Sequence, residues 1–176
     1  TRLPSSKHWT FGTSFISVGR PPVAVVSSPL KAEAARKSGA AAVVDLSTEI
    51  LSDVVFSLTA GQGADLAFDP VGGSLLKELI KSLRERGSVV SIGFASGAEA
   101  CLDLAEIVIH EKRLLGYDAW LETGEAVSSA FSAIRTFIEK GVVRPVIDSA
   151  WKLEEHEKAY KRLASRQAIG TILIRP

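Results

Sequence analysis

Short apolar runs alternate with amphipathic stretches along most of this chain. Four of these runs are short and apolar enough for buried strands, namely Val23–Val26, Ala40–Asp45, Ala64–Phe68 and Ser88–Ile92. Between them, apolar residues recur every three or four positions with charged residues on the opposite side, which predicts amphipathic helices. Strands that alternate with helices in this way predict a doubly wound α/β fold with a parallel sheet.

Segment 64–97 contains the clearest strand–helix–strand unit. Asp69-Pro70 ends the first strand, because proline cannot donate to a sheet ladder, and Gly72-Gly73 permits a tight turn. The next helix is expected to end before Gly87, and its apolar face is formed by Leu75, Leu76, Leu79, Ile80 and Leu83. The two strands of such a unit pair in parallel. Since ligands bind outside the carboxyl ends of parallel strands, we expect a site near Gly72-Gly73 and Gly93–Gly97.

The remaining elements follow from helix caps and periodicity. Ser28 and Pro29 suit the N-cap and first residue of a helix over 30–38, and Ser47 or Thr48 is expected to cap a helix over 50–58. Beyond Gly97 we expect a short helix, a strand, a long helix, an extended segment, an amphipathic helix and a terminal strand, over residues 102–110, 113–117, 124–140, 145–149, 153–164 and 170–174.

Residues 1–20 stand apart from residues 21–176. Trp9, Phe11 and Phe15 are separated by polar neighbours, a pattern typical of a half-buried strand, and a poorly ordered leader is the alternative. We therefore divide the chain into a leader or replacement strand over 1–20 and one α/β domain over 21–176.

The composition excludes several classes of protein. Hydrophobic residues make up 46% of the chain and charged residues 23%, as in globular domains, and a net charge of +1 favours neither a nucleic-acid nor a membrane partner. The single cysteine, Cys101, excludes an internal disulfide and a zinc site built mainly from thiolates. No apolar run approaches the roughly 18 residues of a membrane span. We expect a cytoplasmic protein.

The first strand-to-helix junction is the most informative place for chemistry. Ser27 and Ser28 follow a strand, and Lys31 lies in the first turn of the next helix. Two hydroxyls and an ammonium beside free backbone N–H groups could bind a phosphate. Basic and hydroxyl residues at this place in dinucleotide-binding folds accommodate a 2′-phosphate, whereas an acid binds an unmodified ribose. The alternative is a helix cap followed by a solvated lysine.

Two further candidates lie at strand ends. Asp69 could accept hydrogen bonds from a ligand or, as in many Asp-Pro pairs, from backbone N–H groups of the following turn. The small residues of Gly93–Gly97 would let a flat ligand approach the backbone, and they do not match the G-x-S-x-G nucleophile motif. The sequence indicates no catalytic acid or base and no set of metal ligands.

With these residues, the chain resembles the carboxyl-terminal, nucleotide-binding part of a medium-chain dehydrogenase/reductase of the zinc-independent quinone oxidoreductase type. The resemblance covers Val23 to Ile174 and depends on ordered blocks, VAVVSSPLKAEAARKSGA, AFDPVGG, GSVVSIGFASG, LLGYD, GVVRPVID and GTILI. It implies a Rossmann-like NADP-binding domain over residues 21–176.

The resemblance also implies roles for individual residues. Ser27 and Lys31 would bind the adenosine 2′-phosphate, so that NADPH is preferred over NADH. Three residues, Asp69, Val71 and Gly72, would lie near the nicotinamide ribose, and three more, Gly93, Phe94 and Ala95, would line the nicotinamide side of the cleft. Family members commonly dimerise by joining sheet edges, here through Leu114–Trp120.

Two departures from the family pattern shape the expected function. Family members carry an amino-terminal catalytic domain and begin the nucleotide domain with a strand and a glycine-rich turn, and residues 1–20 match neither. The missing strand would leave its neighbours unpaired unless residues 10–18 replace it. The resemblance implies NADPH-dependent reduction of a quinone or an activated double bond, with low activity for this chain alone. The alternative is a non-catalytic truncated isoform or a binding module.

Overall fold

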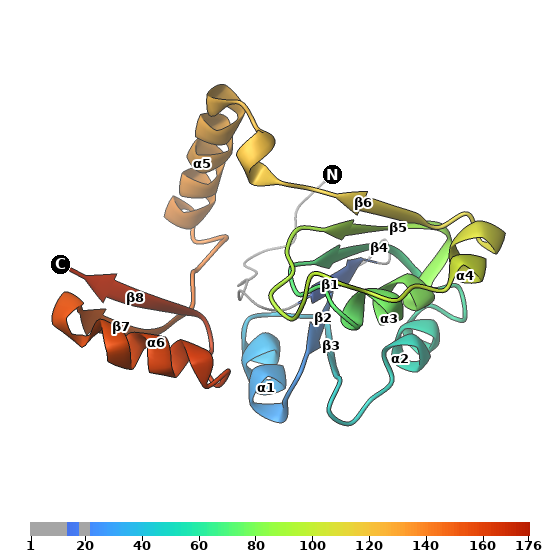
Figure 1. Ribbon diagram of the computed structural model, residues 1–176, viewed down its shortest axis with the longest axis horizontal. Helices are drawn as coiled ribbons and strands as arrows, with labels where there is room; N and C mark the ends of the chain where they lie inside the picture. Colours follow the sequence, from blue (N-terminus) through green and yellow to red (C-terminus); the bar gives the residue numbers. More distant parts are fainter. Residues whose placement is uncertain (1–13, 18–21) are drawn as a thin grey trace.

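The computed structural model describes residues 14–17 and 22–176 (Figure 1). Six strands form one sheet in the order β3-β2-β1-β4-β5-β6. These are β1 (Ser14–Ser17), β2 (Val23–Val26), β3 (Ala42–Asp45), β4 (Ala64–Asp69), β5 (Leu83–Ser91) and β6 (Arg113–Gly116). Every neighbouring pair is parallel except those formed by β1, which runs antiparallel to both β2 and β4. The sheet is therefore mixed: the predicted parallel pairing is confirmed for β2 with β3, β4 with β5 and β5 with β6, and it does not hold for β1.

Strand β1 occupies the place that the sequence left without a partner strand. Its backbone pairs Ile16 with Val23 on one side and with Ala67 on the other. Buried backbone N–H and C=O groups must find partners, and β1 provides them for both neighbours in the reverse direction. The expectation that residues 10–18 replace the missing strand holds for Ser14–Ser17, and Trp9 and Phe11 lie outside the described residues.

Helices cover both faces of the sheet, as a doubly wound fold requires. They are α1 (Pro29–Lys37), α2 (Leu51–Leu58), α3 (Leu75–Ser82) and α4 (Leu104–Ile109). Alternate residues of β2 point to opposite faces. Val23 and Val25 pack in the larger core with residues of α2 and α3, while Ala24 and Val26 pack in a smaller core with α1.

The boundary between α3 and β5 differs from the prediction. The helix ends at Ser82 rather than before Gly87, and β5 begins at Leu83, which pairs with Ala64 of β4. Pairing across the sheet outweighs the helical spacing of Leu83 because it satisfies backbone groups and buries that side chain, which is 1% exposed. Arg84 then forms an ion pair with Asp65 at 2.6 Å.

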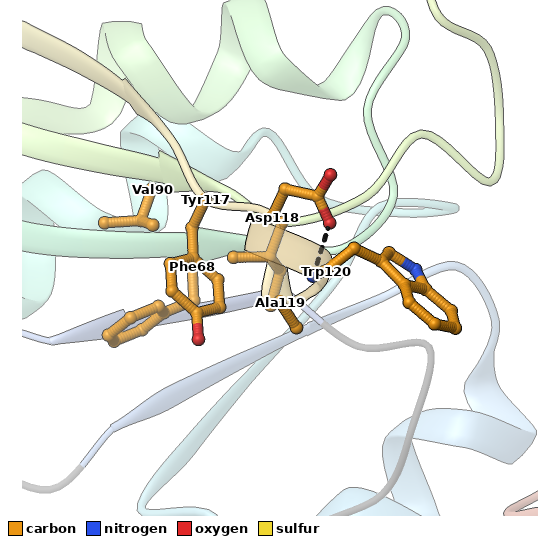
Figure 2. Close-up of a pocket in the computed structure, with 7 residues that line it drawn as sticks. Phe68, Val90, Tyr117, Asp118, Ala119 and Trp120 are labelled. Carbon is orange, nitrogen blue, oxygen red and sulfur yellow. Dashed lines mark hydrogen bonds between the residues drawn. The ribbon is translucent and has the colours of Figure 1, made fainter. Parts of the chain in front are cut away.

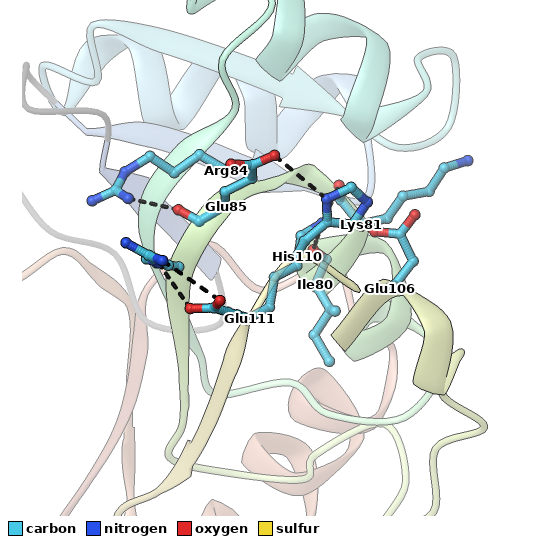
Figure 3. A network of polar contacts seen from close by, with 9 residues as sticks. Ile80, Lys81, Arg84, Glu85, Glu106, His110 and Glu111 are labelled. Carbon is cyan, nitrogen blue, oxygen red and sulfur yellow. Dashed lines mark hydrogen bonds and ion pairs between the residues drawn. The ribbon is translucent and has the colours of Figure 1, made fainter. Parts of the chain in front are cut away.

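A buried lysine joins the same end of the sheet to the helices. The Nζ of Lys112 donates to the carbonyl oxygens of Ile80 and Lys81 at 3.0 and 3.3 Å and pairs with Glu106 at 2.7 Å. Its ammonium thereby satisfies carbonyls at the carboxyl end of α3, where a positive charge is favoured. Hydrogen bonds and ion pairs that involve Lys81, Arg84, Glu106 and Glu111 lie at this end of the sheet, including one from Arg84 to the carbonyl oxygen of Glu85 (Figure 3). These residues stabilise the fold at the end opposite to the predicted site.

The expected cap of α2 was wrong. Its N-cap is Ile50, without a side-chain hydrogen bond. Ser47 instead donates from its backbone N and its Oγ to Asp45 Oδ1, at 3.0 and 2.7 Å, and the backbone N of Thr48 donates to the Asp45 carbonyl at 3.0 Å. An aspartate at a strand end forms such turns readily, so these residues close β3 rather than start the helix.

The last third of the chain leaves the sheet (Figure 1). It comprises the short helix η1 (Ala119–Leu121), α5 (Gly124–Glu139), β7 (Ile147–Lys152), η2 (Leu153–Glu155), α6 (His156–Ala164) and β8 (Thr171–Arg175). Strands β7 and β8 form a separate two-stranded parallel sheet that contacts α6. No residue of α5, which is described throughout, is buried. None of the helices in the described part of the chain is long and apolar enough to cross a membrane.

Candidate functional site

The junction between β2 and α1 brings the three predicted phosphate ligands together. Ser28 is the N-cap of α1, and its Oγ accepts a hydrogen bond from the backbone N of Lys31 at 3.4 Å. The Nζ of Lys31 donates to Ser27 Oγ, also at 3.4 Å, and Ser27 is exposed. A hydroxyl and an ammonium therefore lie at the start of a helix, where backbone N–H groups and the helix dipole favour an anion. The residue after β2 is a serine, not the acid that binds an unmodified ribose.

Asp69 holds the turn that follows β4. It is fully buried, and its Oδ1 accepts hydrogen bonds from the backbone N of Val71 at 2.9 Å and of Gly72 at 3.0 Å. This is the structural alternative considered for Asp69. The turn presents the backbone of residues 70–73 at the carboxyl end of the sheet.

The loop after β5 locks against this turn. Ser96 donates from its backbone N to the carbonyl of Val71 at 2.8 Å and from its Oγ to that of Gly72 at 2.9 Å. A β-bridge joins Gly72 to Gly97, and a Cβ on Gly93 would lie 2.6 Å from the Pro70 carbonyl oxygen.

Of the predicted residues, Val71, Gly72 and Gly93 thus meet in one packed pair of loops. Phe94 and Ala95 belong to the loop after β5 and are exposed, Phe94 with 72% of its surface. Sequence reasoning did not identify Ser96 as the residue that joins the two loops.

Strand β1 separates the two halves of the candidate site. Ser27 follows β2 and Asp69 ends β4, so they lie on either side of β1, about 10 Å apart by ordinary strand spacing. In dinucleotide-binding folds the strand at this position leads into a glycine-rich turn and a helix that together hold the pyrophosphate. Here β1 arrives from the opposite direction, and among described residues the next element is β2, not a helix. A 2′-phosphate, as in NADP, would fit Ser27, Ser28 and Lys31, whereas in the described part of the chain β1 does not lead into a glycine-rich turn and a helix that could hold a pyrophosphate.

An apolar pocket of about 570 Å³ opens at the carboxyl ends of β4, β5 and β6 (Figure 2). Its sheet side is formed by Phe68, Val90 and Ile92, which point to the same face because alternate residues of a strand do so. We call it the aromatic pocket. The sequence analysis did not identify this pocket, because Phe68 and Val90 lie in apolar runs together with Ala67 and Val89, which belong to the core.

The other wall of the aromatic pocket comes from the segment after β6. It consists of Tyr117, Asp118, Ala119 and Trp120. Asp118 Oδ1 accepts a hydrogen bond from the backbone N of Trp120 at 3.0 Å and so begins η1 (Figure 2). Loss of hydration, followed by the neighbouring Glu122 carboxylate, raises the pKa of the Tyr117 phenol, so this phenol is neutral at physiological pH.

Residues 14–17 and 22–176 contain no group of three or more His, Cys, Asp or Glu side chains placed to hold a metal ion. The carboxyl edge of their sheet carries the Ser27–Lys31 contact at the start of α1, two glycine-containing loops joined by hydrogen bonds, and the aromatic pocket. That combination defines a nucleotide-binding domain of the doubly wound α/β class.

The comparisons with known proteins agree with this class. Residues 17–135 match the family model described as zinc-binding dehydrogenase. The chain belongs to this family, within the quinone oxidoreductase-like members of the medium-chain dehydrogenase/reductase superfamily, and corresponds to their carboxyl-terminal nucleotide-binding domain.

Individual relatives resemble this chain over part of their length. A 2-haloacrylate reductase from a Burkholderia species is 29% identical over 167 residues, which are 90% of this chain and 49% of that protein. A quinone oxidoreductase from Pseudomonas aeruginosa is 29% identical over 159 residues, covering 88% of this chain and 48% of the relative. The chain spans about half the length of the curated relatives it matches.

A solved structure supports the same fold. The crystal structure of Escherichia coli quinone oxidoreductase complexed with NADPH aligns with a TM-score of 0.79 at 24% identity, over 88% of this chain and 49% of that one. The alternation of strands and helices predicted from the sequence is therefore confirmed at the level of the family fold.

Proposed function

We propose that this chain is the nucleotide-binding half of an NADPH-dependent oxidoreductase that reduces a quinone or an activated double bond. The observation that carries the proposal is the Ser27–Lys31 contact at the start of α1, where a 2′-phosphate would lie. Membership of the zinc-binding dehydrogenase family, whose relatives include quinone oxidoreductases, supports the reaction class. As the resemblance implies, the proposed reaction is zinc-independent.

In this proposal each predicted residue contributes to orienting the cofactor. Ser27, Ser28 and Lys31 bind the adenosine 2′-phosphate, and the turn built on Asp69 carries Val71 and Gly72 to the nicotinamide ribose. Gly93, Phe94 and Ala95 line the nicotinamide side. The bound cofactor supplies a hydride to the acceptor, and the protein's part is to position the two and exclude water.

We further propose that cofactor binding and turnover by this chain alone are weak. Phosphate contacts at a glycine-rich turn contribute much of the cofactor affinity in such folds. Strand β1 is antiparallel to its neighbours and therefore does not lead into such a turn at the carboxyl edge of the sheet. The same observation favours a second candidate function, a non-catalytic binding module that keeps the nucleotide-domain fold.

A titration of NADPH against NADH by calorimetry tests the cofactor assignment. We expect NADPH to bind about tenfold more tightly, because a 2′-phosphate gains charge-assisted hydrogen bonds at Lys31. Lys31→Glu should abolish this preference. The matched control is Lys37→Glu, which reverses a charge in the last turn of the same helix and should leave the preference unchanged.

Two outcomes would contradict the proposal. Equal affinity for both cofactors, unaffected by Lys31→Glu, would refute the assignment of Ser27, Ser28 and Lys31 to the 2′-phosphate. Steady oxidation of NADPH by a quinone with this chain alone would refute the weak turnover proposed for it.

A further inference from the structure

The proposed function does not say which class of electron acceptor binds in the aromatic pocket. Two acceptor classes occur in the names of relatives, neutral quinones and the anionic 2-haloacrylates. We propose that the aromatic pocket takes neutral planar ring compounds and disfavours anionic acceptors, with Asp118 setting this preference. The choice of ligands to compare rests on the proposed function. The expected preference for neutral over anionic ligands rests on the residues that line the pocket.

The shape of the pocket suits a flat, apolar molecule. Phe68 and Ile92, which both line the pocket, expose 40% and 46% of their surfaces. Phe68 lies beside the Tyr117 ring (Figure 2). A planar ring laid on this face would cover apolar surface and could stack on the aromatic side chains. The volume, about 570 Å³, lies within the usual range of small-molecule sites.

Within the described part of the chain, the pocket is lined by one acidic side chain and by no basic one. Its acidic residue is Asp118, and none of the seven described lining residues is a lysine, arginine or histidine. Glu122 lies close enough to Tyr117 to raise the pKa of its phenol, so a second carboxylate borders the same wall. A carboxylate ligand would therefore be repelled without a compensating cation, whereas a neutral quinone would not.

The test measures ligand binding without cofactor, by saturation-transfer NMR on the wild-type chain. Duroquinone is the neutral probe, because its fully methylated ring offers no free carbon to the exposed thiol of Cys101. The anionic probe is 2-chloroacrylate. We expect duroquinone to bind and 2-chloroacrylate to bind about tenfold more weakly or not at all.

Three variants locate and explain the preference. Asp118→Asn keeps an acceptor for the Trp120 backbone N and removes the charge, so it should strengthen 2-chloroacrylate binding about three- to tenfold while duroquinone changes less than about twofold. The matched control is Asp103→Asn, since Asp103 caps α4 through the N–H of Ala105 in the same way but does not line the pocket. Tyr117→Ala should weaken duroquinone binding at least about threefold.

Equal binding of the two probes to the wild-type chain would overturn the inference, as would failure of duroquinone to bind. A response to Asp103→Asn equal to that of Asp118→Asn would also overturn it. Because no NADPH is present, failure of the cofactor titration would refute the proposed function and leave these binding results unaffected.

Discussion

Asp69, Asp118 and Asp148 each accept hydrogen bonds from backbone N–H groups of a loop next to a strand. Asp69 does so from Val71 and Gly72, Asp118 from Trp120, and Asp148 from Ile169. An aspartate at a strand end is equally compatible with a ligand contact and with a turn. At the residue scale, only the positions of the neighbouring N–H groups decide between the two.

Asp148 is a carboxylate whose ionisation is coupled to folding. Its two carboxylate oxygens pair with Arg162 Nη2 and Nε at 2.8 and 3.0 Å, and its Oδ1 also accepts from Ile169 N at 2.8 Å. The hydrogen bonds from Arg162 lower the pKa of Asp148 from 3.8 to about 2, and burial opposes this shift. The lowered pKa means that the folded state prefers the ionised form.

We therefore expect acid to weaken the unit formed by β7, β8 and α6. The stability from Asp148 is fully present above its unfolded pKa and is lost as the pH falls from about 4 to about 2, by about 1–2 kcal/mol. Asp148→Asn should be less stable than wild type at pH 6, and the difference should vanish near pH 2. Urea unfolding followed by tryptophan fluorescence measures this.

The control for that series is Glu154→Gln, at an exposed position of η2. It should follow the wild-type pH profile. A constant difference between Asp148→Asn and wild type from pH 6 to pH 2 would contradict the assignment.

At the scale of elements, β1 is the segment whose direction the pattern of residues did not reveal. A strand between two neighbours satisfies their backbone groups whether it runs parallel or antiparallel to them, and alternation of apolar residues has the same period in both directions. The parallel pairings of β2 with β3 and of β4 with β5, by contrast, follow from the helices that connect them.

The direction of β1 can be tested by disulfide trapping in a Cys101→Ser background. The antiparallel register places Ser14 opposite Val25. Cysteines at 14 and 25 should therefore cross-link under mild oxidation, because paired Cα atoms lie within about 5.5 Å of each other. Non-reducing electrophoresis or mass spectrometry detects the bond.

Cysteines at 14 and 23 are the matched control, since Val23 lies opposite Ile16. Those two Cα atoms are separated by about 8 Å in the antiparallel register, beyond the reach of a disulfide. Efficient cross-linking of 14 with 23 rather than with 25 would show that β1 runs the other way.

On the scale of the whole molecule, apolar surface is concentrated at β6 and α5. Leu115 of the edge strand is 49% exposed, and Phe131 and Ile134 of α5 are 68% and 47% exposed. An edge strand with apolar side chains is a ready site for pairing with another strand. The resemblance implies dimerisation through Leu114–Trp120, and this remains a prediction.

We expect the chain to form a dimer at micromolar concentrations through the β6 edge. Leu115→Lys should shift the equilibrium towards monomer at least about tenfold, because charges on an edge strand oppose pairing. Sedimentation equilibrium measures the change. Leu30→Lys on α1, at a position 54% exposed, should leave the equilibrium unaltered. A wild-type chain that is monomeric throughout, or equal effects of both variants, would contradict the edge interface.

The amino-acid sequence by itself determined the alternation of strands and helices, the parallel βαβ units and the closeness of Ser27 to Lys31. Each depends on residues near one another along the chain, through strand period, helix period or a spacing of four residues at a helix start. Only the tertiary structure decided the direction of β1, the start of β5 at Leu83 and the aromatic pocket. These depend on which distant segments pair, and the free energy of satisfying buried backbone groups and covering apolar surface is a property of the assembled sheet.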